Sequence, residues 1–564
     1  MFAGLLPLLV LIGIVVLIVR ALGKGREQTG ESVGVLIRRL FQYLAMLAAL
    51  ALVGFGLAGV LEAVFVSTEG VTDETDLIAR SVAFLVVGVP VYTGLALYAR
   101  SRLRVDPEES SSLGWATYLT GALIGSLVAS MVSSAILLGE ALAGDGLATA
   151  SLLSLVIWGL VWISHRWVAH RFGDPDMMWV EHVIGSFAGL SVALASGAVA
   201  LGIASSWAYV SIFDVPSIGG RWDDLAPAIA IATVAAVVWG RYWLLVARHD
   251  ARRPLWTAYV LLAGVLTGVL MSVSGAATAL FFGLDWFLGD TAESASSYFE
   301  AIPAALAILA VGAASWTYHR SVLGTRRTGI RTEIDRVYDY LLAAVGLAVG
   351  VGGVATLIAY GVRALAGFEI TGSDGSAIAV ALTLLIVGAP LWALHWRRVQ
   401  REWRSDPSVF GLSISRRIYL PVVVGVACGT ALVGLIVTVY LAVQDLVEGT
   451  FGRGTLDTVA VPVALVLATA GVGWYHVRVL LGDRVTLTPA PVHAVREVIL
   501  VSEDGEALVS AMSAAHYRIR RLHASAPPSL EDSVEAVLRV LDAETHERVV
   551  IVTTGDRFEV LPLD

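Results

Sequence analysis

The chain has 564 residues, of which 57% are hydrophobic and 15% charged, and its mean hydropathy is +0.77. Soluble domains carry about 25% charged residues, so this composition excludes an ordinary soluble protein and places most of the chain in lipid. The single cysteine, Cys428, excludes an intramolecular disulfide and a thiolate cluster. Its small neighbours in an apolar run indicate a buried, inert thiol. The sequence has no basic patch of the kind that would predict nucleic-acid binding.

The amino-terminal stretch is apolar from Met1 to Val19 and has no basic residue before it. A secretory signal peptide would begin with a positive region, so we expect a retained transmembrane helix, with a cleaved signal as the alternative. Basic residues follow at Arg20, Lys24 and Arg26. Residues 1–37 are therefore predicted to form one transmembrane helix and a cytoplasmic linker.

Further apolar segments, each long enough to cross about 30 Å of hydrocarbon with about 20 residues, follow in order. We predict spans at 40–66, 78–99, 114–139, 148–165, 180–210, 225–246, 256–284, 299–319, 338–362, 376–396, 418–443 and 457–477. With the first helix this gives about thirteen spans. The predicted fold of residues 38–483 is an all-α polytopic membrane domain.

The spans pair into about six tandem hairpins, because a short aromatic helix end recurs along the chain. Its clearest copy reads Gly-Ala-Pro-Leu-Trp-Ala-Leu-His-Trp-Arg-Arg over 388–398. The aromatic anchors, spaced roughly 70 to 82 residues apart, are Tyr92, Trp162, Trp243, Trp316, Trp392 and Trp474. The first helix of each hairpin opens with Tyr43, Tyr118, His182, Tyr259, Tyr340 or Tyr419. Both ends of every hairpin then lie on one side, where we expect the aromatic rings to sit at the headgroup level.

The loops set the predicted orientation. Arginines concentrate in the loops on the side where hairpins begin and end, such as 100–104, 248–253 and 397–404, whereas the opposite loops are acidic. The positive-inside rule assigns the arginine-rich side to the cytoplasm. We expect a bacterial inner-membrane protein with its amino terminus outside and its carboxyl terminus in the cytoplasm.

Residues 484–564 change composition and predict a small cytoplasmic α+β domain of about 80 residues. Strands are predicted at 495–501, 517–523, 548–553 and 558–561, the last two forming a hairpin. Helices are predicted at 506–515 and after Ser529, which has Asp532 three residues later as in a capping box.

The central thirds of the spans contain no Asp, Glu, Lys or Arg, which argues against a proton- or ion-coupled pump. They are instead rich in small residues, as in Gly121…Gly125…Ser130, Gly185…Gly189…Ser196, Ser272…Gly275 and Gly346…Gly350. Such residues four apart allow close helix packing, the interpretation that we favour over a hydroxyl-lined pathway.

His165, His319 and His395 occupy the same position of the recurring helix end. We interpret them as interfacial anchors that reach the headgroups, with a converging metal, haem or anion site as the alternative. No zinc signature, phosphate-binding loop or nucleophile elbow is present in the sequence. We therefore predict no catalytic, cofactor-binding or metal-binding residue and no enzymatic activity.

The element over 388–398, with the tyrosine-containing start of the preceding helix, resembles a bacterial domain-of-unknown-function family. That family has tandem two-helix membrane repeats with Trp-x-x-His-Trp-Arg-Arg-like helix ends. The resemblance covers most of 38–482 and implies the repeat architecture, but it implies no activity.

Uncharged span interiors and an appended soluble domain favour a non-enzymatic scaffold or sensor. Its partners are the lipid bilayer and a cytoplasmic protein that binds residues 484–564. The alternative is a channel or carrier for a small neutral or weakly polar solute, which the many glycines and hydroxyls suggest. An intramembrane enzyme ranks third, because no acid–base or metal constellation is found within a span.

Overall fold

The computed structural model describes residues 33–66, 74–146, 148–215, 221–249, 254–324, 333–367, 374–405, 413–486, 497–501, 512, 517–522, 534–543, 548–554 and 557–562. Its contacts divide the chain into two compact units. The first unit comprises residues 1–405 and 413–477, and the second comprises 406–412 and 478–564. The predicted first helix, residues 1–19, lies outside the described residues.

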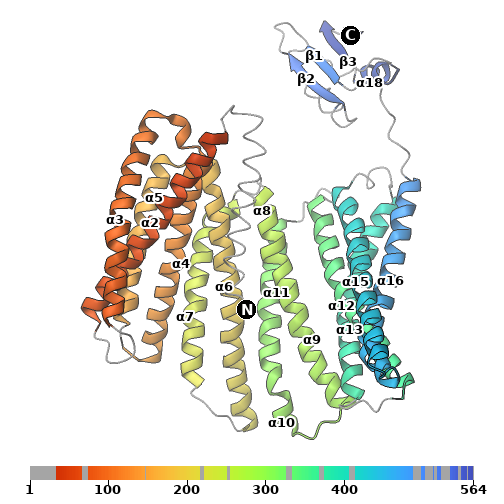
Figure 1. Ribbon diagram of the computed structural model, residues 1–564. Coiled ribbons are helices and arrows are strands. Elements are labelled where there is room, and N and C mark those ends of the chain that lie inside the picture. Colours follow the sequence, from red (N-terminus) through yellow and green to blue (C-terminus); the bar gives the residue numbers. More distant parts are fainter. Residues whose placement is uncertain are drawn as a thin grey trace. The chain divides into compact units, whose positions relative to one another are not determined.

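The first unit is built from long helices (Figure 1). They are α2 (Val33–Phe65), α3 (Glu74–Val105), α4 (Leu113–Ala143), α5 (Thr149–Phe172), α6 (Pro175–Phe213), α7 (Arg221–Trp239), α9 (Thr267–Leu288), α11 (Ile302–Leu323), α12 (Glu333–Leu365), α13 (Asp374–Ser405), α15 (Ile414–Val447) and α16 (Arg453–Thr486). Shorter segments are η2 (Pro107–Glu109), η3 (Gly240–Leu244), η4 (Ala247–His249), α8 (Pro254–Ala258), η5 (Tyr259–Leu266), α10 (Ala295–Tyr298) and η6 (Phe299–Ala301).

Within the described residues, twelve helical spans are long and apolar enough to cross a membrane. They coincide with the twelve spans predicted after the first helix, so the all-α polytopic fold is confirmed. Local signals set the helix ends. For example, the Ser112 hydroxyl accepts a hydrogen bond from the Trp115 amide at the start of α4, and Gly144 ends that helix with a φ of +85°.

Consecutive helices pack as pairs, and successive pairs interlock. α2 packs on α3, α4 on α5, α6 on α7, α9 on α11 and α12 on α13. In addition, the first helix of one pair packs on the second helix of the following pair, as α2 does on α5, α4 on α7, α6 on α11 and α9 on α13. Each of these four first helices therefore joins two pairs.

Glycines allow the closest of these contacts. A Cβ on Gly388 would overlap the backbone nitrogen of Gly350, and one on Gly312 would lie 2.6 Å from the nitrogen of Ser272. Hydroxyls in these helices turn back to their own backbone, as Ser272 does to the Gly268 carbonyl at 2.7 Å. At Gly312, Gly388 and Ser272 the small residues allow close helix packing, the role that we favoured for them.

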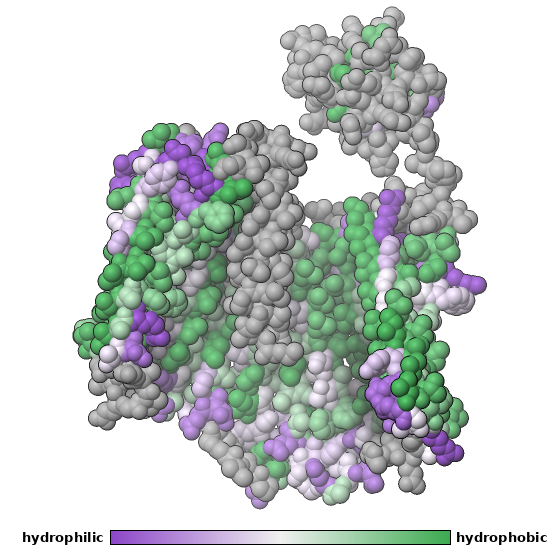
Figure 2. Space-filling view, viewed as in Figure 1, coloured by the Kyte–Doolittle hydropathy of each residue, from purple (hydrophilic) through white to green (hydrophobic). Residues whose placement is uncertain are grey.

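The outward faces of the helices are apolar. Figure 2 shows hydrophobic residues spread over the visible outer surface of the bundle, and α15 exposes Val422, Val426 and Leu432 among others. Cys428 lies on the same helix and is exposed, so the prediction of a buried thiol is wrong. An apolar run fits contact with lipid as well as contact with protein, and the sequence around Cys428 did not separate the two.

The second unit contains a four-stranded sheet in the order β2-β1-β3-β4. β1 (Glu497–Val501) is parallel to β2 (Arg518–Leu522) and to β3 (Arg548–Thr554), and β4 (Arg557–Pro562) is antiparallel to β3. These strands confirm the four predicted ones. The predicted helix 506–515 lies outside the described residues except for Met512, and the helix predicted after Ser529 is described only as α18 (Val534–Ala543).

This unit has its own core, which contains Val498, Met512, Tyr517, Val537, Leu541, Val549 and Ile551. The Tyr517 hydroxyl donates a hydrogen bond to Asp542 at 2.8 Å. Burial, together with that carboxylate, raises the pKa of Tyr517 well above its usual value, so the hydroxyl keeps its proton.

Candidate functional site

Aromatic side chains join the end of one helix pair to the start of the next. The hydroxyls of Tyr92 and Tyr118 lie 3.0 Å apart. The indole nitrogen of Trp239 donates to the Tyr259 hydroxyl at 2.9 Å, and that of Trp316 donates to the Tyr338 hydroxyl at 3.1 Å. These bonds fix the connections between hairpins.

A second series of bonds joins the second helices of successive pairs. Indole nitrogens donate to tyrosine hydroxyls in Trp162–Tyr242 (3.2 Å), Trp243–Tyr318 (3.0 Å) and Trp396–Tyr475 (2.8 Å). Trp243 and Trp396 are almost completely buried, so the place at the headgroup level that we predicted for the anchor Trp243 is wrong. Trp474 is 62% exposed and is still available for that role. Aromatic residues at a helix end can face lipid or a neighbouring helix, and the helical face decides which.

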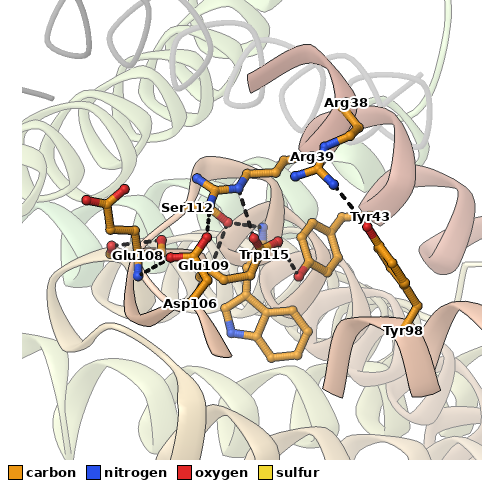
Figure 3. A network of polar contacts seen from close by, with 10 residues as sticks. Arg38, Arg39, Tyr43, Tyr98, Asp106, Glu108, Glu109, Ser112 and Trp115 are labelled. Carbon is orange, nitrogen blue, oxygen red and sulfur yellow. Dashed lines mark hydrogen bonds and ion pairs between the residues drawn. The ribbon is translucent and has the colours of Figure 1, made fainter. Parts of the chain in front are cut away.

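Buried ion pairs accompany the aromatic bonds (Figure 3). Arg39 of α2 binds Glu109 at 2.9 Å and Asp106 at 2.8 Å, and the Tyr43 hydroxyl donates to Glu109 at 2.8 Å. Arg39 and Glu109 are both buried. Removing one partner of such a pair costs about 3–5 kcal/mol, because the other charge is left uncompensated.

Two further buried acids occupy helix ends, and sequence reasoning did not single them out. Glu181 of α6 binds Arg166 at 2.9 Å and lies 3.0 Å from His182 Nδ1. Asp339 of α12 lies 2.6 Å from His395 Nδ1. Both acids stand beside the first-helix aromatic or histidine, and this adjacency was the available signal. A carboxylate orients an imidazole in this way in many sites, but the pair alone defines no reaction.

The recurring histidines are buried, so their interpretation as headgroup anchors is wrong. His165, His319, His395 and His476 are all at most 6% exposed. Among the described residues, no group of three or more histidine, cysteine or acidic side chains could hold a metal ion. Each of these rings contacts a side chain of another helix: His165 contacts Tyr118, His319 contacts Trp239, His395 contacts Asp339 and His476 contacts Trp396.

Hydrogen bonds fix the tautomer of three of these rings. Nδ1 of His165, His319 and His476 lies 2.8–2.9 Å from the carbonyl oxygen four residues earlier. A carbonyl only accepts, so Nδ1 carries the proton and Nε2 of the neutral ring is an acceptor. Nε2 of His165 accepts from the Tyr118 hydroxyl at 2.7 Å. Nε2 of His319 and of His476 is buried and has no partner among the described residues.

Around His319 the aromatic residues form a cluster that we name cluster one: Trp239, Trp243, Tyr259, Tyr318 and His319. The His319 ring centroid lies 4.9–6.2 Å from the centroids of the other four rings. Trp243 lies in the π-helical segment η3, and Tyr259 begins the π-helical segment η5. π-Helical turns are rare and often mark functional positions.

Cluster two repeats the same residue types about 155 positions later: Trp392, Trp396, Tyr419, Tyr475 and His476. The His476 ring contacts Trp396, Tyr419 and Tyr475 at centroid distances of 5.3, 6.1 and 5.1 Å. The Trp396–Tyr475 bond matches the Trp243–Tyr318 bond of cluster one. In contrast, the Trp392 indole nitrogen and the Tyr419 hydroxyl are buried without a partner among the described residues.

A cavity of about 320 Å³ lies beside cluster two, between α12, α13 and α16. Its walls include Gly346, Gly350 and Val354 of α12, Leu385, Ala389 and Trp392 of α13, and Ala468, Val472, Tyr475 and His476 of α16. No charged residue is among those that line it.

A second, larger cavity of about 510 Å³ lies between α4, α6 and α7. Its lining is mainly apolar, with Met131, Val192 and Ile231 among the wall residues. Glu140, Asp145 and Asp223 also line it. None of these acids belongs to the aromatic clusters.

The fold and these contacts define a multi-pass membrane protein of unknown biochemistry. The chain belongs to the family described as "Domain of unknown function (DUF5671)", whose model matches residues 39–163 and 336–495. No curated protein and no solved structure matches the chain. The second matched stretch contains cluster two and its cavity, whereas cluster one lies between the two stretches.

Proposed function

We propose that this protein is a non-enzymatic sensor or scaffold of the bacterial inner membrane that binds a cytoplasmic protein through its carboxyl-terminal unit. The observation that supports this function is an α+β unit with its own core, appended to a bundle of apolar helices. A unit with its own core can present a binding surface independently of the bundle.

The bundle is proposed to be a tandem array of hairpins. The hydrogen bonds between second helices join residues 80, 75 and 79 positions apart. The family model also matches two separate stretches of the chain. A constant separation between equivalent contacts is typical of repeat architectures, in which each unit packs on its neighbours.

The proposed orientation places the carboxyl-terminal unit in the cytoplasm, and cysteine labelling tests it. The native cysteine is first removed by Cys428→Ser, and a single cysteine is then introduced by Asp223→Cys or Arg397→Cys. A membrane-impermeant maleimide added to spheroplasts is expected to label the cysteine at 223 and not the one at 397. Labelling at 397 in intact spheroplasts contradicts the orientation, and labelling after lysis controls for access.

Partner binding is tested by affinity purification from cells, with cross-linking and quantitative mass spectrometry. We expect a chain that ends after residue 486 to lose the cytoplasmic proteins that the full chain retains. Val549 is completely buried in the second unit, so Val549→Asp should unfold that unit and lose the same proteins. An unchanged set of partners in both variants contradicts the proposal. The thermal unfolding of the truncated bundle shows whether its helices remain folded.

The cavity between α12, α13 and α16 supports the second candidate function, a carrier for a small neutral solute. A carrier of this kind would move its solute into sealed vesicles that contain the purified protein. The truncated chain should then transport as well as the full chain, because the cavity residues all precede residue 478.

A further inference from the structure

We propose that copies of this chain associate head to tail in the membrane, with α15 of one copy packed on α3 of the next copy. This contact repeats, between two chains, the way in which successive helix pairs interlock within one chain. The proposal does not depend on the proposed partner-binding role of the carboxyl-terminal unit.

Small residues recur where the first helix of one pair packs on the second helix of the following pair. A Cβ on Gly139 of α4 would lie 3.6 Å from Pro227 of α7, and one on Gly202 of α6 would lie 3.6 Å from Ala304 of α11. The cluster that joins α12 to α16 contains five alanines: Ala355, Ala359, Ala460, Ala464 and Ala468. Small residues let membrane helices approach closely, so they mark the contact by which each pair joins the next.

Two helices stand outside this series. No pair of described helices follows α15 and α16, and none precedes α2 and α3. In the most apolar stretch of each span, 11% of the residues are buried in α3 and in α15, against 22–50% in the other ten described spans. α15 is therefore a first helix without a following pair, and α3 is a second helix without a preceding one.

The free face of α15 carries two glycines. Ala427 of α15 faces α16, where a Cβ on Gly473 would lie 3.6 Å from the Ala427 Cβ. Gly425 and Gly429 lie two residues before and after Ala427, and therefore on the opposite face of the helix. An added Cβ at either glycine has no atom within 4 Å. The structure thus leaves room for a close helix contact on this face.

The equivalent glycine of α2 is covered by a helix. Gly56 of α2 faces α3, where its added Cβ would lie 2.9 Å from Leu85. Gly54 is two residues earlier, on the opposite face, and its added Cβ would overlap the ring of Trp158 of α5. Gly54 is placed relative to Gly56 as Gly425 is placed relative to Ala427. In α2 the second helix of the following pair fills this place.

The free face of α3 has the residue types that such a contact uses. Ser81 and Leu85 face α2, since they are the neighbours of the added Cβ atoms of Gly59 and Gly56. Ala79 and Ala83 lie two residues before them, on the opposite face, and are exposed.

Val86 continues this face of α3 and is 66% exposed. Glycines on a first helix facing alanines on a second helix is the combination by which Gly202 meets Ala304 within the chain. A second copy supplies this combination at both ends of the helix array. Such a contact joins different surfaces of the two copies, so it builds rings or rows of subunits.

Cross-linking in native membranes tests the contact. Cys428→Ser first removes the native cysteine. Val86→Cys then marks the free face of α3, and Leu432→Cys marks that of α15, because Leu432 is 59% exposed and lies three residues after Gly429. When the two single-cysteine chains are co-expressed with different tags, we expect a short bis-maleimide to join one to the other. Either chain expressed alone is expected to remain uncross-linked.

A bulky side chain on the free face of α15 should prevent the contact. Adding Gly425→Leu and Gly429→Leu to the Leu432→Cys chain is expected to abolish the cross-link without a clash inside the chain. Gly159→Leu in α5 is the matched control, since an added Cβ there also has no atom within 4 Å, and should leave the yield unchanged. Thermal unfolding and circular dichroism show whether the glycine variants fold as the unmodified chain does.

Dimers formed by the Leu432→Cys chain alone overturn the proposal, because they indicate a symmetric contact between two α15 helices. The absence of a cross-link between the two marked chains also overturns it, provided that both cysteines react with a simple maleimide, and indicates that lipid covers these faces. The same holds if folded Gly425→Leu/Gly429→Leu chains cross-link as well as the Gly159→Leu control. None of these outcomes bears on the proteins that bind the carboxyl-terminal unit.

Discussion

Clusters one and two contain the same residue types at corresponding positions. Only in cluster one, however, does the first tryptophan donate a hydrogen bond to the tyrosine of the next helix pair. The Trp239 indole nitrogen donates to the Tyr259 hydroxyl, whereas the Trp392 indole nitrogen and the Tyr419 hydroxyl have no hydrogen-bond partner among the described residues. The connection from Trp392 to Tyr419 is longer than the connection from Trp239 to Tyr259. A short connection holds the next helix close to the preceding one, and a longer connection permits other positions. The same aromatic residues can therefore either pack closely between two helix pairs or leave a cavity beside them.

The backbone differs between the two clusters as well. The helices that carry cluster one contain the π-helical segments η3 and η5, whereas α13, α15 and α16 are described as α-helical throughout. A π-helical turn holds one more residue than an α-helical turn and so rotates the side chains that follow. In cluster one, this rotation accompanies the closed arrangement around His319.

The largest difference between the clusters is expected from an added methyl group. A Cβ at Gly264 would overlap the His319 ring, so Gly264→Ala should lower the free energy of unfolding by about 1–3 kcal/mol through overpacking. Gly425 of α15 has no atom within 4 Å of its added Cβ, and Gly425→Ala should be neutral or stabilising by about 0.5–1 kcal/mol. Thermal unfolding of both purified variants in detergent measures the difference.

An equal loss of stability in the two glycine variants would show that cluster one is not tightly packed around His319. Circular dichroism at low temperature checks that both variants retain the helix content of the unmodified chain. Gly264→Ala should also change the fluorescence of the neighbouring tryptophans, because the His319 ring must move away from Trp239 and Trp243.

The next largest difference is expected from the tyrosine hydroxyls. Tyr259→Phe removes the acceptor of the Trp239 N–H and leaves a buried donor unsatisfied, which should cost about 1–3 kcal/mol. Tyr419→Phe removes a hydroxyl without a described partner and should cost nothing or stabilise the protein. Chemical unfolding followed by tryptophan fluorescence compares the two. A similar cost for both would mean that the Tyr419 hydroxyl is bonded, and the comparison would then fail.

The sequence predicted the helices of this fold well, because apolar length and turn residues are local properties. It also located Trp392, Tyr419 and the histidines at the correct helix ends. It did not predict which helical face each side chain would occupy, and Trp243 and His319 were therefore assigned to headgroups instead of helix contacts. The difference between the clusters depends on helix register across the connections, which the aromatic pattern alone does not specify.

The smallest difference is expected where the two clusters agree. The Tyr318 hydroxyl accepts from Trp243 at 3.0 Å and the Tyr475 hydroxyl accepts from Trp396 at 2.8 Å, so Tyr318→Phe and Tyr475→Phe should each cost about 1–3 kcal/mol, as Tyr259→Phe does. We expect the two costs to agree within about 0.5 kcal/mol, measured by the same unfolding experiment. Agreement here, together with disagreement between Tyr259→Phe and Tyr419→Phe, would localise the difference between the clusters to the first tryptophan of each. Unequal costs at Tyr318 and Tyr475 would instead indicate that the clusters differ as a whole, and cluster one could then no longer serve as the closed reference for cluster two.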